Sequence, residues 1–297
     1  IMNNYPIIKL RKGKDEAVKR YHPWIFSGAI ETAADGLQAG DIVTVVDYKN
    51  NILGNGFAEA GNIVVKILTF DDRKIDSDFW KERLAKAFEL RKMMGLTDNE
   101  HTNCYRLVHS EGDNLPGLII DIYGKTAVVQ AQTEGMALNV KAIADALMTI
   151  EGLNITSVYN KSSEAMQRMG KDAVEDGYLI GESSDEFVLE NDSKFFVDWE
   201  EGQKTGFFLD QRYNRDLVRQ LAKGKNVLNT FCYTGGFSVT ALRGGANKVV
   251  SVDCSKKAIA ACEKNIALNG FDVKENPSVA EDAKLFIQNM KKGEFYL

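Results

Sequence analysis

The sequence predicts an α/β multidomain protein in which a small N-terminal β-barrel and an α+β central domain precede an incomplete, doubly wound C-terminal domain. Three observations carry this prediction. The 297 residues are too many for one ordinary compact domain. Short β-branched runs fill the start of the chain, and strands alternate with helices from Leu209 onward, as in a parallel sheet with helices on both faces. We therefore divide the chain into residues 1–72, 73–185 and 186–297.

The N-terminal barrel is predicted from three short runs that are rich in Val and Ile. They occupy residues 41–47, 52–60 and 62–70, and Asn and Gly turn signals separate them. Runs of this kind favour a small barrel over the first part of the chain.

A helical period marks the start of the central domain. Four apolar residues lie on one face of a helix from about Asp76 to Met94, namely Trp80, Leu84, Ala87 and Phe88. Residues 117–133 then predict two strands around a Tyr-Gly-Lys turn, followed by a helix to about Ile150 and a strand near residues 155–159. This mixture indicates an α+β domain.

The C-terminal third begins with a hairpin over residues 186–199 that turns at Asn191 to Ser193. Helices and strands then alternate, helix first, over residues 209–222, 226–231, 237–244, 248–253 and 255–270. This order predicts a parallel, doubly wound sheet. We expect a fourth strand of the sheet to begin in the last residues, Gly-Glu-Phe-Tyr-Leu.

Composition excludes several classes of protein. Hydrophobic residues make up 44% of the chain and charged residues 27%, and no apolar run has the length of about 20 residues that a membrane span needs. The start of the chain lacks the apolar stretch of a signal peptide, so we expect a cytoplasmic protein without membrane contact. The four cysteines form no CxxC pair and have no His at ligand spacing, which indicates neither a metal site nor disulfides.

Charge is distributed unevenly along the chain. The formal net charge is −5, yet residues 1–24 carry six bases against two acids, and residues 162–202 carry twelve acids against three bases. We expect an anionic partner to meet the basic N-terminal lobe, although a solvated charged surface accounts for the pattern equally well.

The clearest candidate site runs from Asn229 to Gly236 and includes Asp253. A strand ends at Asn229, and the following turn enters a helix near Phe237. Gly235 and Gly236 lack a Cβ, which allows positive φ and a close approach of the backbone to a ligand at a helix start. Asp253 ends the next strand seventeen residues after Gly236, where a carboxylate can accept hydrogen bonds from both ribose hydroxyls. The glycine pair by itself is commonly structural.

The loop distinguishes between two cofactors. A dinucleotide site needs the spacing GxGxxG, which the residues around Gly235 lack. S-adenosylmethionine has no pyrophosphate, so its amino-acid end needs only a tight loop, and a later acid can contact its adenine. Asp282 is placed for that contact, although an N-cap of the helix that it opens is an equally good interpretation.

Five strings in family order resemble the PUA-containing class I methyltransferases of large-subunit ribosomal RNA. They are HPWIFSGAI (22–30), YRLVHSEGDNLPGLIIDIYG (105–124), EGQKTGFFLDQRYNR (201–215), and the pair VLNTFCYTGGFSV and VVSVDCS around the cofactor site. The resemblance covers nearly the whole chain. It implies a Rossmann-like domain that transfers a methyl group from S-adenosylmethionine to carbon 5 of a cytosine in the rRNA.

The resemblance also implies roles for individual residues. It assigns cofactor binding to Gln211, Arg212, Asn229, Thr230, Tyr233, Gly235, Gly236, Asp253 and Asp282, with the first two at the cofactor mouth. PUA modules bind RNA, which gives a role to Arg11, Lys12, His22 and Trp24. From the residues alone, the string around Gln211 predicts only a helix start, and Trp24 predicts a core residue. The partners implied are large-subunit rRNA and, as a further hypothesis, a second copy of the chain.

The implied chemistry requires a cysteine thiolate that adds to carbon 6 of the cytosine, and a base that later removes the proton from carbon 5. The family carries this cysteine in a later loop, so we expect it beyond Leu297 and expect the chain by itself to be inactive. Cys232 is a poor candidate because it lies where the loop meets the cofactor. Two alternatives stay open: a non-catalytic RNA-binding assembly protein that uses the fold as a scaffold, and an RNA purine N-methyltransferase.

Overall fold

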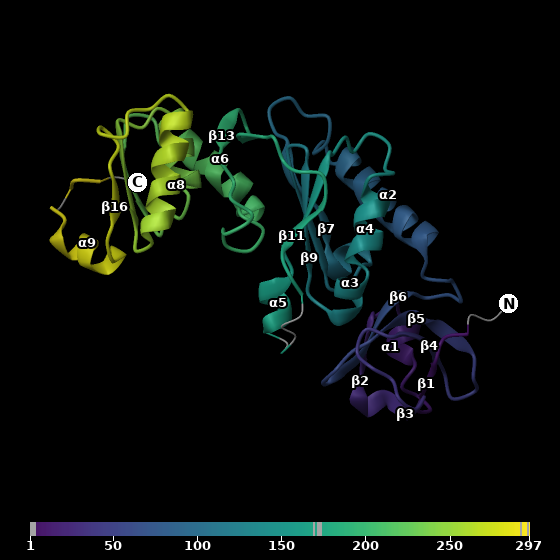
Figure 1. The fold of residues 1–297 in the computed structure, drawn as a ribbon. Helices are drawn as coiled ribbons and strands as arrows, with labels where there is room; N and C mark the ends of the chain where they lie inside the picture. The colour runs from purple at the N-terminus through teal and green to yellow at the C-terminus, as the bar shows by residue number, and fades with distance from the viewer. Residues whose placement is uncertain (1–3, 169, 171–173, 292, 296) are drawn as a thin grey trace. The chain divides into compact units, whose positions relative to one another are not determined.

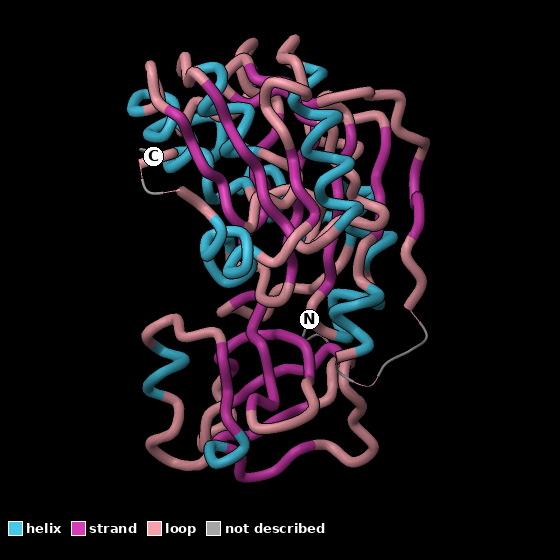
Figure 2. The backbone as a smooth tube through the Cα atoms, turned by 90° about the vertical axis from the view of Figure 1, so that its left-hand side faces the viewer, coloured by secondary structure: helices cyan, strands magenta, loops and turns pink. Residues whose placement is uncertain are grey.

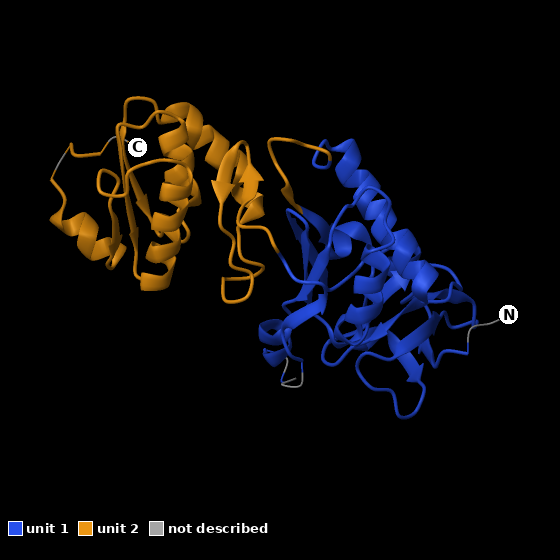
Figure 3. Ribbon diagram, turned by 45° about the horizontal axis from the view of Figure 1, so that its top comes forward, with its two compact units in different colours: residues 1–97, 106–183 blue, residues 98–105, 184–297 orange. Residues whose placement is uncertain are grey.

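The computed structural model describes residues 4–168, 170, 174–291, 293–295 and 297 (Figure 1). The chain divides into two compact units (Figure 3). Unit 1 comprises Ile1–Thr97 and Arg106–Ser183, and unit 2 comprises Asp98–Tyr105 and Ser184–Leu297. The short segment Asp98–Tyr105 groups with unit 2 although it precedes most of the central sheet in sequence. Each unit is described by itself.

The first sheet of unit 1 has six strands in the order β2-β6-β5-β4-β1-β3. Its strands are β1 (Ile7–Leu10), β2 (Trp24–Phe26), β3 (Ile30–Ala33), β4 (Ile42–Val46), β5 (Ile52–Ala58) and β6 (Ile63–Thr69), with the helices α1 (Glu16–Lys19) and η1 (Ser27–Ala29) between them. β1 and β4 pair in parallel and the other neighbours are antiparallel. The three strands predicted here are confirmed as β4, β5 and β6.

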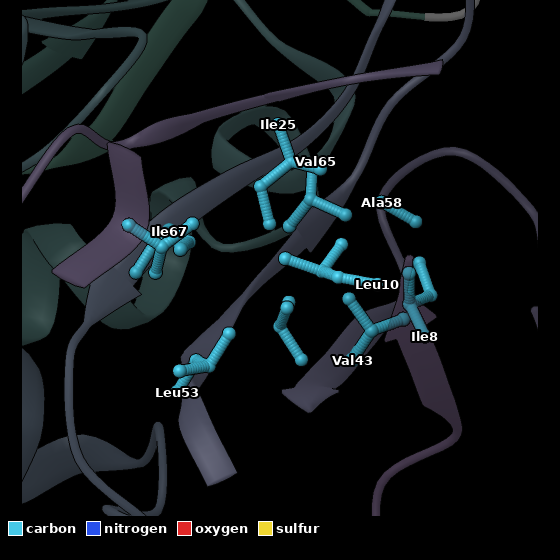
Figure 4. Packing of buried hydrophobic residues seen from close by; sticks show 10 residues of the cluster. Ile8, Leu10, Ile25, Val43, Leu53, Ala58, Val65 and Ile67 are labelled. Atoms are coloured by element: carbon cyan, nitrogen blue, oxygen red, sulfur yellow. The ribbon is translucent and has the colours of Figure 1, made fainter. Parts of the chain in front are cut away.

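The barrel-like sheet encloses its own apolar core (Figure 4). Ile8, Leu10, Val43 and Val65 are each at most 3% exposed and come from the three strands β1, β4 and β6. Alternate residues of a strand point to one face, so the β-branched runs of the sequence supply this core directly.

The second sheet of unit 1 has the order β11-β10-β9-β8-β7. Its strands are β7 (Cys104–His109), β8 (Leu118–Tyr123), β9 (Thr126–Ala131), β10 (Ser157–Asn160) and β11 (Gly177–Ile180). The accompanying helices are α2 (Ser77–Met93), η2 (Ser110–Asp113), α3 (Glu134–Leu138), α4 (Val140–Leu147) and α5 (Ser163–Gln167). The two strands predicted around the Tyr-Gly-Lys turn are confirmed as β8 and β9.

Helix α2 confirms the helical period of the sequence. Asp76 caps it by accepting hydrogen bonds from the amides of Asp78 and Phe79, both at 3.2 Å. The four predicted face residues are all buried. The single helix predicted to reach about Ile150 is wrong in one respect, because it is divided into α3 and α4. Asn139 lies at the break, where its side chain donates to Gly135 O at 2.8 Å and competes with a continuous helix.

Unit 2 contains the predicted hairpin, β12 (Val188–Glu190) with β13 (Ser193–Phe195). Asn191 and Asp192 form its turn with φ values of 49° and 63°. Two successive positive φ values match the twist of a tight hairpin, and Asn and Asp tolerate them better than most residues.

The parallel sheet of unit 2 has the order β14-β15-β16 and confirms the doubly wound prediction. Figure 2 marks the helices and strands of the chain by colour. Its strands are β14 (Asn226–Thr230), β15 (Lys248–Asp253) and β16 (Ser278–Ala280), and its helices are η3 (Leu209–Gln211), α6 (Arg212–Leu221), α7 (Gly236–Arg243), α8 (Lys256–Leu268) and α9 (Ala283–Asn289). Helices cover both faces of the sheet. Val250 and Val252 pack on Ala283 of α9, whereas Ser251, on the opposite face, contacts Ser238 of α7 with 2.7 Å between their hydroxyls.

The expected fourth strand is not assigned as a strand in the part of the chain that the structure describes, and Tyr296 lies outside the described residues. Leu228 N nevertheless donates to Leu297 O at 2.9 Å, so the chain returns to the edge of β14. No described helix is long and apolar enough to cross a membrane.

Candidate functional site

A cavity of about 410 Å³ lies in unit 2 at the carboxyl ends of β14 and β15. Its walls come from the segment before α6, the loop between β14 and α7, and the start of α8, through Asp198, Glu201, Gly202, Gln203, Phe208, Phe231, Tyr233, Thr234, Asp253, Ser255, Lys257, Ala258 and Ala261. Open parallel sheets bind ligands at this edge, and the volume lies in the range of about 300–1,000 Å³ that is usual for small-molecule sites.

Asp253 presents its carboxylate to the cavity from the last position of β15. Tyr233 N donates to Oδ2 at 3.0 Å and Ser255 N donates to Oδ1 at 2.9 Å. The two amides fix the orientation of the carboxylate and leave each oxygen with a further lone pair. The group can therefore accept hydrogen bonds from two neighbouring hydroxyls.

The loop after β14 is held in an unusual backbone conformation. Phe231 and Tyr233 have φ values of 57° and 49°, and Gly235 has 78°. Positive φ in residues with a Cβ costs on the order of 1–3 kcal/mol each and persists where the surroundings enforce it. The hydrogen bond from Cys232 N to Val252 O, at 3.1 Å, ties the loop to the end of β15.

The Tyr233 side chain joins this loop to the segment 198–208. Its Oη accepts from Gln203 N at 2.9 Å and donates to Gly206 O at 3.1 Å. Its ring stands edge-on to Phe208 with 5.4 Å between centroids. Burial raises the pKa of Tyr233, so the phenol stays a hydrogen-bond donor at neutral pH.

Charged side chains gather around Lys257 in the cavity wall. Lys257 Nζ pairs with Glu201 and, at 3.4 Å, with Asp198 Oδ2. The hydrogen bond to Glu201 is the main reason that the pKa of Lys257 is raised. Two carboxylates against one ammonium leave this part of the wall negative.

Thr234 lines the cavity and contains a polar atom without a partner. Its Oγ1 is buried and makes no hydrogen bond to any described residue. Buried hydroxyls are nearly always hydrogen-bonded in folded proteins. A polar ligand in the cavity would satisfy it.

A family model of S-adenosylmethionine-dependent methyltransferases matches residues 106–292. The chain belongs to this family. The predicted enzyme class and the predicted cofactor, S-adenosylmethionine, are therefore confirmed. A model of PUA-like domains matches residues 8–70, the region of the six-stranded sheet.

Relatives match the methyltransferase chain over nearly its whole length. It is 35% identical over 290 residues to the ribosomal RNA large subunit methyltransferase I of Enterobacter sp. (strain 638), an alignment that covers 96% of this chain and 72% of that protein. It is 37% identical over 293 residues to the protein of the same name from Aeromonas hydrophila, covering 97% of this chain and 73% of that protein.

Solved structures share the fold. A protein described as a methyltransferase complexed with SAH has a TM-score of 0.80 at 24% identity, covering 95% of this chain and 71% of its own. A SAM-dependent methyltransferase from Streptococcus mutans has a TM-score of 0.78 at 24% identity, covering 95% and 72%.

The residues around the cavity fit the methyl donor. Asp253 offers acceptors for ribose hydroxyls, Phe208 and Tyr233 offer ring surfaces, and the Thr234 hydroxyl has no hydrogen-bond partner among the described residues. Asp198 and Glu201 supply negative charge, which suits a ligand that carries an ammonium group and a sulfonium. The cavity therefore suits a ligand that is partly aromatic and positively charged.

Of the predicted cofactor residues, the structure brings Tyr233 and Asp253 together in the cavity wall. Asn229, Thr230, Gly235 and Gly236 belong to the same strand and loop but do not line the cavity. The side chain of Asn229 points into the interior, where its Nδ2 donates to Ser238 Oγ at 2.9 Å.

The structure gives a packing reason for the two glycines of the loop. A Cβ on Gly235 would lie 2.5 Å from Cys262 Sγ, and a Cβ on Gly236 would lie 3.3 Å from Arg215 Cδ. Only Gly235 has positive φ, because Gly236 is the first residue of α7. The glycines let the loop pack closely on α8 and α6, and the expected close approach of the backbone to a ligand stays a prediction.

Gln211 and Arg212, which were expected at the cofactor mouth, do not line that cavity, and their contact with the cofactor stays a prediction. Arg212 donates to Cys104 O and to Glu190 Oε2, the latter at 3.3 Å. Arg215 completes the cluster with bonds of 2.6 and 2.7 Å to the same carboxylate. The buried Glu190 of β12 needs these cations as partners, which draws Arg212 toward the hairpin. Gln211 forms hydrogen bonds with Asp210, its neighbour in the chain, and with Asn214, three residues later.

Asp282 is confirmed as an N-cap. Its Oδ1 accepts from Lys284 N at 2.9 Å and from Leu285 N at 3.1 Å at the start of α9. The side chain is exposed and does not line the cavity.

The four residues predicted to bind RNA all belong to unit 1. Arg11, Lys12 and His22 are exposed, and Arg11 Nε donates to Ile30 O at 2.8 Å. Trp24 is half-buried, and its indole Nε1 donates to Glu111 Oε1 at 2.8 Å. The His22 and Trp24 rings stand edge-on with 6.0 Å between centroids. Trp24 is therefore partly a packing residue.

Sequence reasoning missed several residues of the cavity wall, above all Asp198, Glu201, Phe208 and Lys257. The string EGQKTGFF contains Glu201 and Phe208 and is the most specific match to the family. No spacing in the sequence relates this string to Asp253. Only the resemblance of the string to the family could therefore have indicated that Glu201 and Phe208 belong to the site.

Proposed function

We propose that this methyltransferase transfers the methyl group of S-adenosylmethionine to carbon 5 of a cytosine in large-subunit ribosomal RNA. The observation that carries the proposal is the Asp253 carboxylate, fixed by two backbone amides in a cavity at the carboxyl end of the parallel sheet. The relatives of 35% and 37% identity are named for large-subunit rRNA, which supports the substrate. The choice of carbon 5 rests on the family resemblance.

We assign the parts of the chain to separate tasks. Residues 1–72 bind RNA through Arg11, Lys12, His22 and Trp24, residues 73–185 form the central domain, and residues 186–297 bind the cofactor. Arg11, Lys12 and His22 are exposed, which supports the assignment of RNA binding to residues 1–72. A homodimer stays a prediction, and light scattering on the purified protein tests it.

The chain contributes binding and orientation to the reaction. When bound, S-adenosylmethionine supplies an electrophilic methyl group. Asp253 holds its ribose hydroxyls, the Thr234 hydroxyl bonds a polar atom, and the Tyr233 and Phe208 rings close the walls. Asn229, Thr230, Gly235 and Gly236 act by shaping the loop that carries Tyr233, and Asp282 acts by capping α9.

The cytosine reaction also needs a thiolate. The Cys232 thiol is buried beside Cys262, and this neighbour together with burial raises the pKa of Cys232. Burial likewise raises the pKa of Cys104 to about 12. Both thiols therefore stay protonated at neutral pH, so neither is proposed as the nucleophile.

The decisive experiment is methylation of unmodified large-subunit rRNA by the protein isolated from its host, with isotopically labelled S-adenosylmethionine. Mass spectrometry of the digested RNA should show labelled 5-methylcytidine, and Asp253→Ala should remove it. A labelled methylpurine would overturn the cytosine assignment in favour of purine N-methylation. A protein that binds RNA but no S-adenosylmethionine by calorimetry would favour the scaffold alternative.

A further inference from the structure

Unit 2 contains a second cavity, of about 580 Å³, that shares no residue with the cofactor cavity. Its walls are entirely polar or charged apart from the ring of Tyr213. They comprise Asn99, His101, Thr102, Asn191, Asp192, Arg212, Tyr213, Asp216, Arg219 and Arg243. These residues come from the segment Asp98–Tyr105, the β12–β13 turn, α6 and the end of α7.

Hydrogen bonds hold the walls of this cavity in place. Asp192 N donates to His101 O at 2.9 Å, and Asn191 N donates to Thr102 Oγ1 at 2.9 Å. Asn103 N also bonds Leu189 O at 3.0 Å, so the segment lies along the hairpin as an added edge. On the other side, a Cβ on Gly244 would overlap Arg219 O, which shows how closely the end of α7 approaches α6.

The charges of the cavity leave a positive excess. It contains three arginines and two aspartates. Asp192 Oδ1 pairs with His101 Nδ1 at 2.7 Å. Asp216 is engaged through both oxygens, with Arg219 Nε at 2.7 Å and Gln220 Nε2 at 2.8 Å. The two acids are therefore neutralised within the walls.

Arg243 is the arginine of this cavity that forms no ion pair with a described residue. It is exposed in the last turn of α7, and no ion pair or side-chain hydrogen bond joins its guanidinium to another described residue. Arg212, in contrast, is bound by Glu190 and Arg219 by Asp216. Arg243 can therefore bind an external anion without losing an internal partner.

We propose that this second cavity binds a backbone phosphate of RNA, with Arg243 as the anchoring cation. Arginine presents a planar fork of donors that matches two phosphate oxygens, and interfaces with nucleic acids are polar and positively charged. The lack of an apolar floor argues against a hydrophobic small molecule. The inference rests on the proposed function, which makes RNA the substrate, and it adds an RNA contact on unit 2 to the one expected of the PUA-like region.

The test measures the affinity of the protein for a fluorescently labelled hairpin RNA as a function of salt concentration. Arg243→Ala should weaken binding about 3- to 10-fold and reduce the slope of log K against log salt by about 1. Arg243→Lys keeps the charge and should keep the slope. Lys284→Ala removes an exposed cation of α9 outside both cavities and should change nothing. Unchanged S-adenosylmethionine binding by calorimetry shows that each variant is folded.

Three results would overturn the inference. Equal affinity and slope for Arg243→Ala and the unaltered protein would remove it and leave RNA methylation standing. Failure of the unaltered protein to bind the RNA would remove both. Cytidine monophosphate or inorganic phosphate could also compete with the RNA. If either binds as tightly as the RNA and no longer competes in Arg243→Ala, the cavity would be assigned to a free phosphate compound.

Discussion

The two cavities of unit 2 hold their charged groups in different ways. In the cofactor cavity, the Asp253 carboxylate is fixed by backbone amides and keeps free acceptors, and aromatic rings form part of the wall. In the second cavity, Asp192 pairs with His101 and Asp216 with Arg219, and Arg243 has no ion-pair partner among the described residues. The first arrangement suits a small ligand that is enclosed, and the second suits a charged polymer that crosses a surface. One compact unit thus provides two kinds of recognition.

The largest expected effect comes from Gly235→Val, which should disrupt the conformation of the loop between β14 and α7 in the cofactor cavity. The new side chain would meet Cys262 and would require a β-branched residue at positive φ. We expect a loss of roughly 3–5 kcal/mol in the free energy of unfolding, measured by denaturant titration.

Gly270→Ala is the matched control for that loss. Gly270 has φ of 82° but nothing within 4 Å of an added Cβ, so the substitution should cost only about 1 kcal/mol. Equal losses for the two variants would show that strain of the backbone, and not packing on α8, requires Gly235.

Asp253→Ala should impair ligand binding in the cofactor cavity and leave binding in the second cavity unchanged. It removes the acceptor for the ribose hydroxyls and should weaken S-adenosylmethionine binding by about 1.5–3 kcal/mol, measured by calorimetry. RNA affinity should not change, and Arg243→Ala should show the reverse pattern. An unchanged cofactor affinity would count against Asp253 as the ribose ligand.

A smaller effect is expected for Tyr233→Phe. The ring and its contact with Phe208 stay, but the bonds of the hydroxyl to Gln203 N and Gly206 O are lost. Cofactor affinity should fall by about 1 kcal/mol because the segment 198–208 is no longer held over the cavity. Hydrogen exchange should quicken in residues 202–206, and unaltered exchange there would contradict this positioning role.

The smallest effect is a pH dependence confined to the second cavity. The hydrogen bond to Asp192 raises the pKa of His101 above its usual 6.5, with a further contribution from Glu100. The imidazolium charge is present below this raised pKa and is lost as the pH rises through it. RNA affinity should therefore fall a few-fold as the pH increases from about 6 to 8, whereas His101→Gln should remove this change. A pH effect that persists in His101→Gln would assign it to another group.

Local patterns allowed much of the fold to be predicted. The period of α2, the hairpin turn at Asn191 and the alternation of β14, α7, β15 and α8 all depend on residues that are close in sequence. Asp253 could be predicted for the same reason, because one strand and one helix fix its distance from Gly235. The break at Asn139 could not, because a single side chain bond ends a helix whose apolar period continues.

The sequence by itself therefore determined the fold class, the methyl-donor loop and the acid at the end of β15. Only the tertiary structure decided which other residues share their space. Segment 198–208 reaches the cofactor cavity through Tyr233, Arg212 is drawn away by the buried Glu190, and Arg243 has no partner among the residues that the structure describes. These outcomes depend on packing and charge pairing between segments that are remote in the chain, and no local period or spacing encodes them.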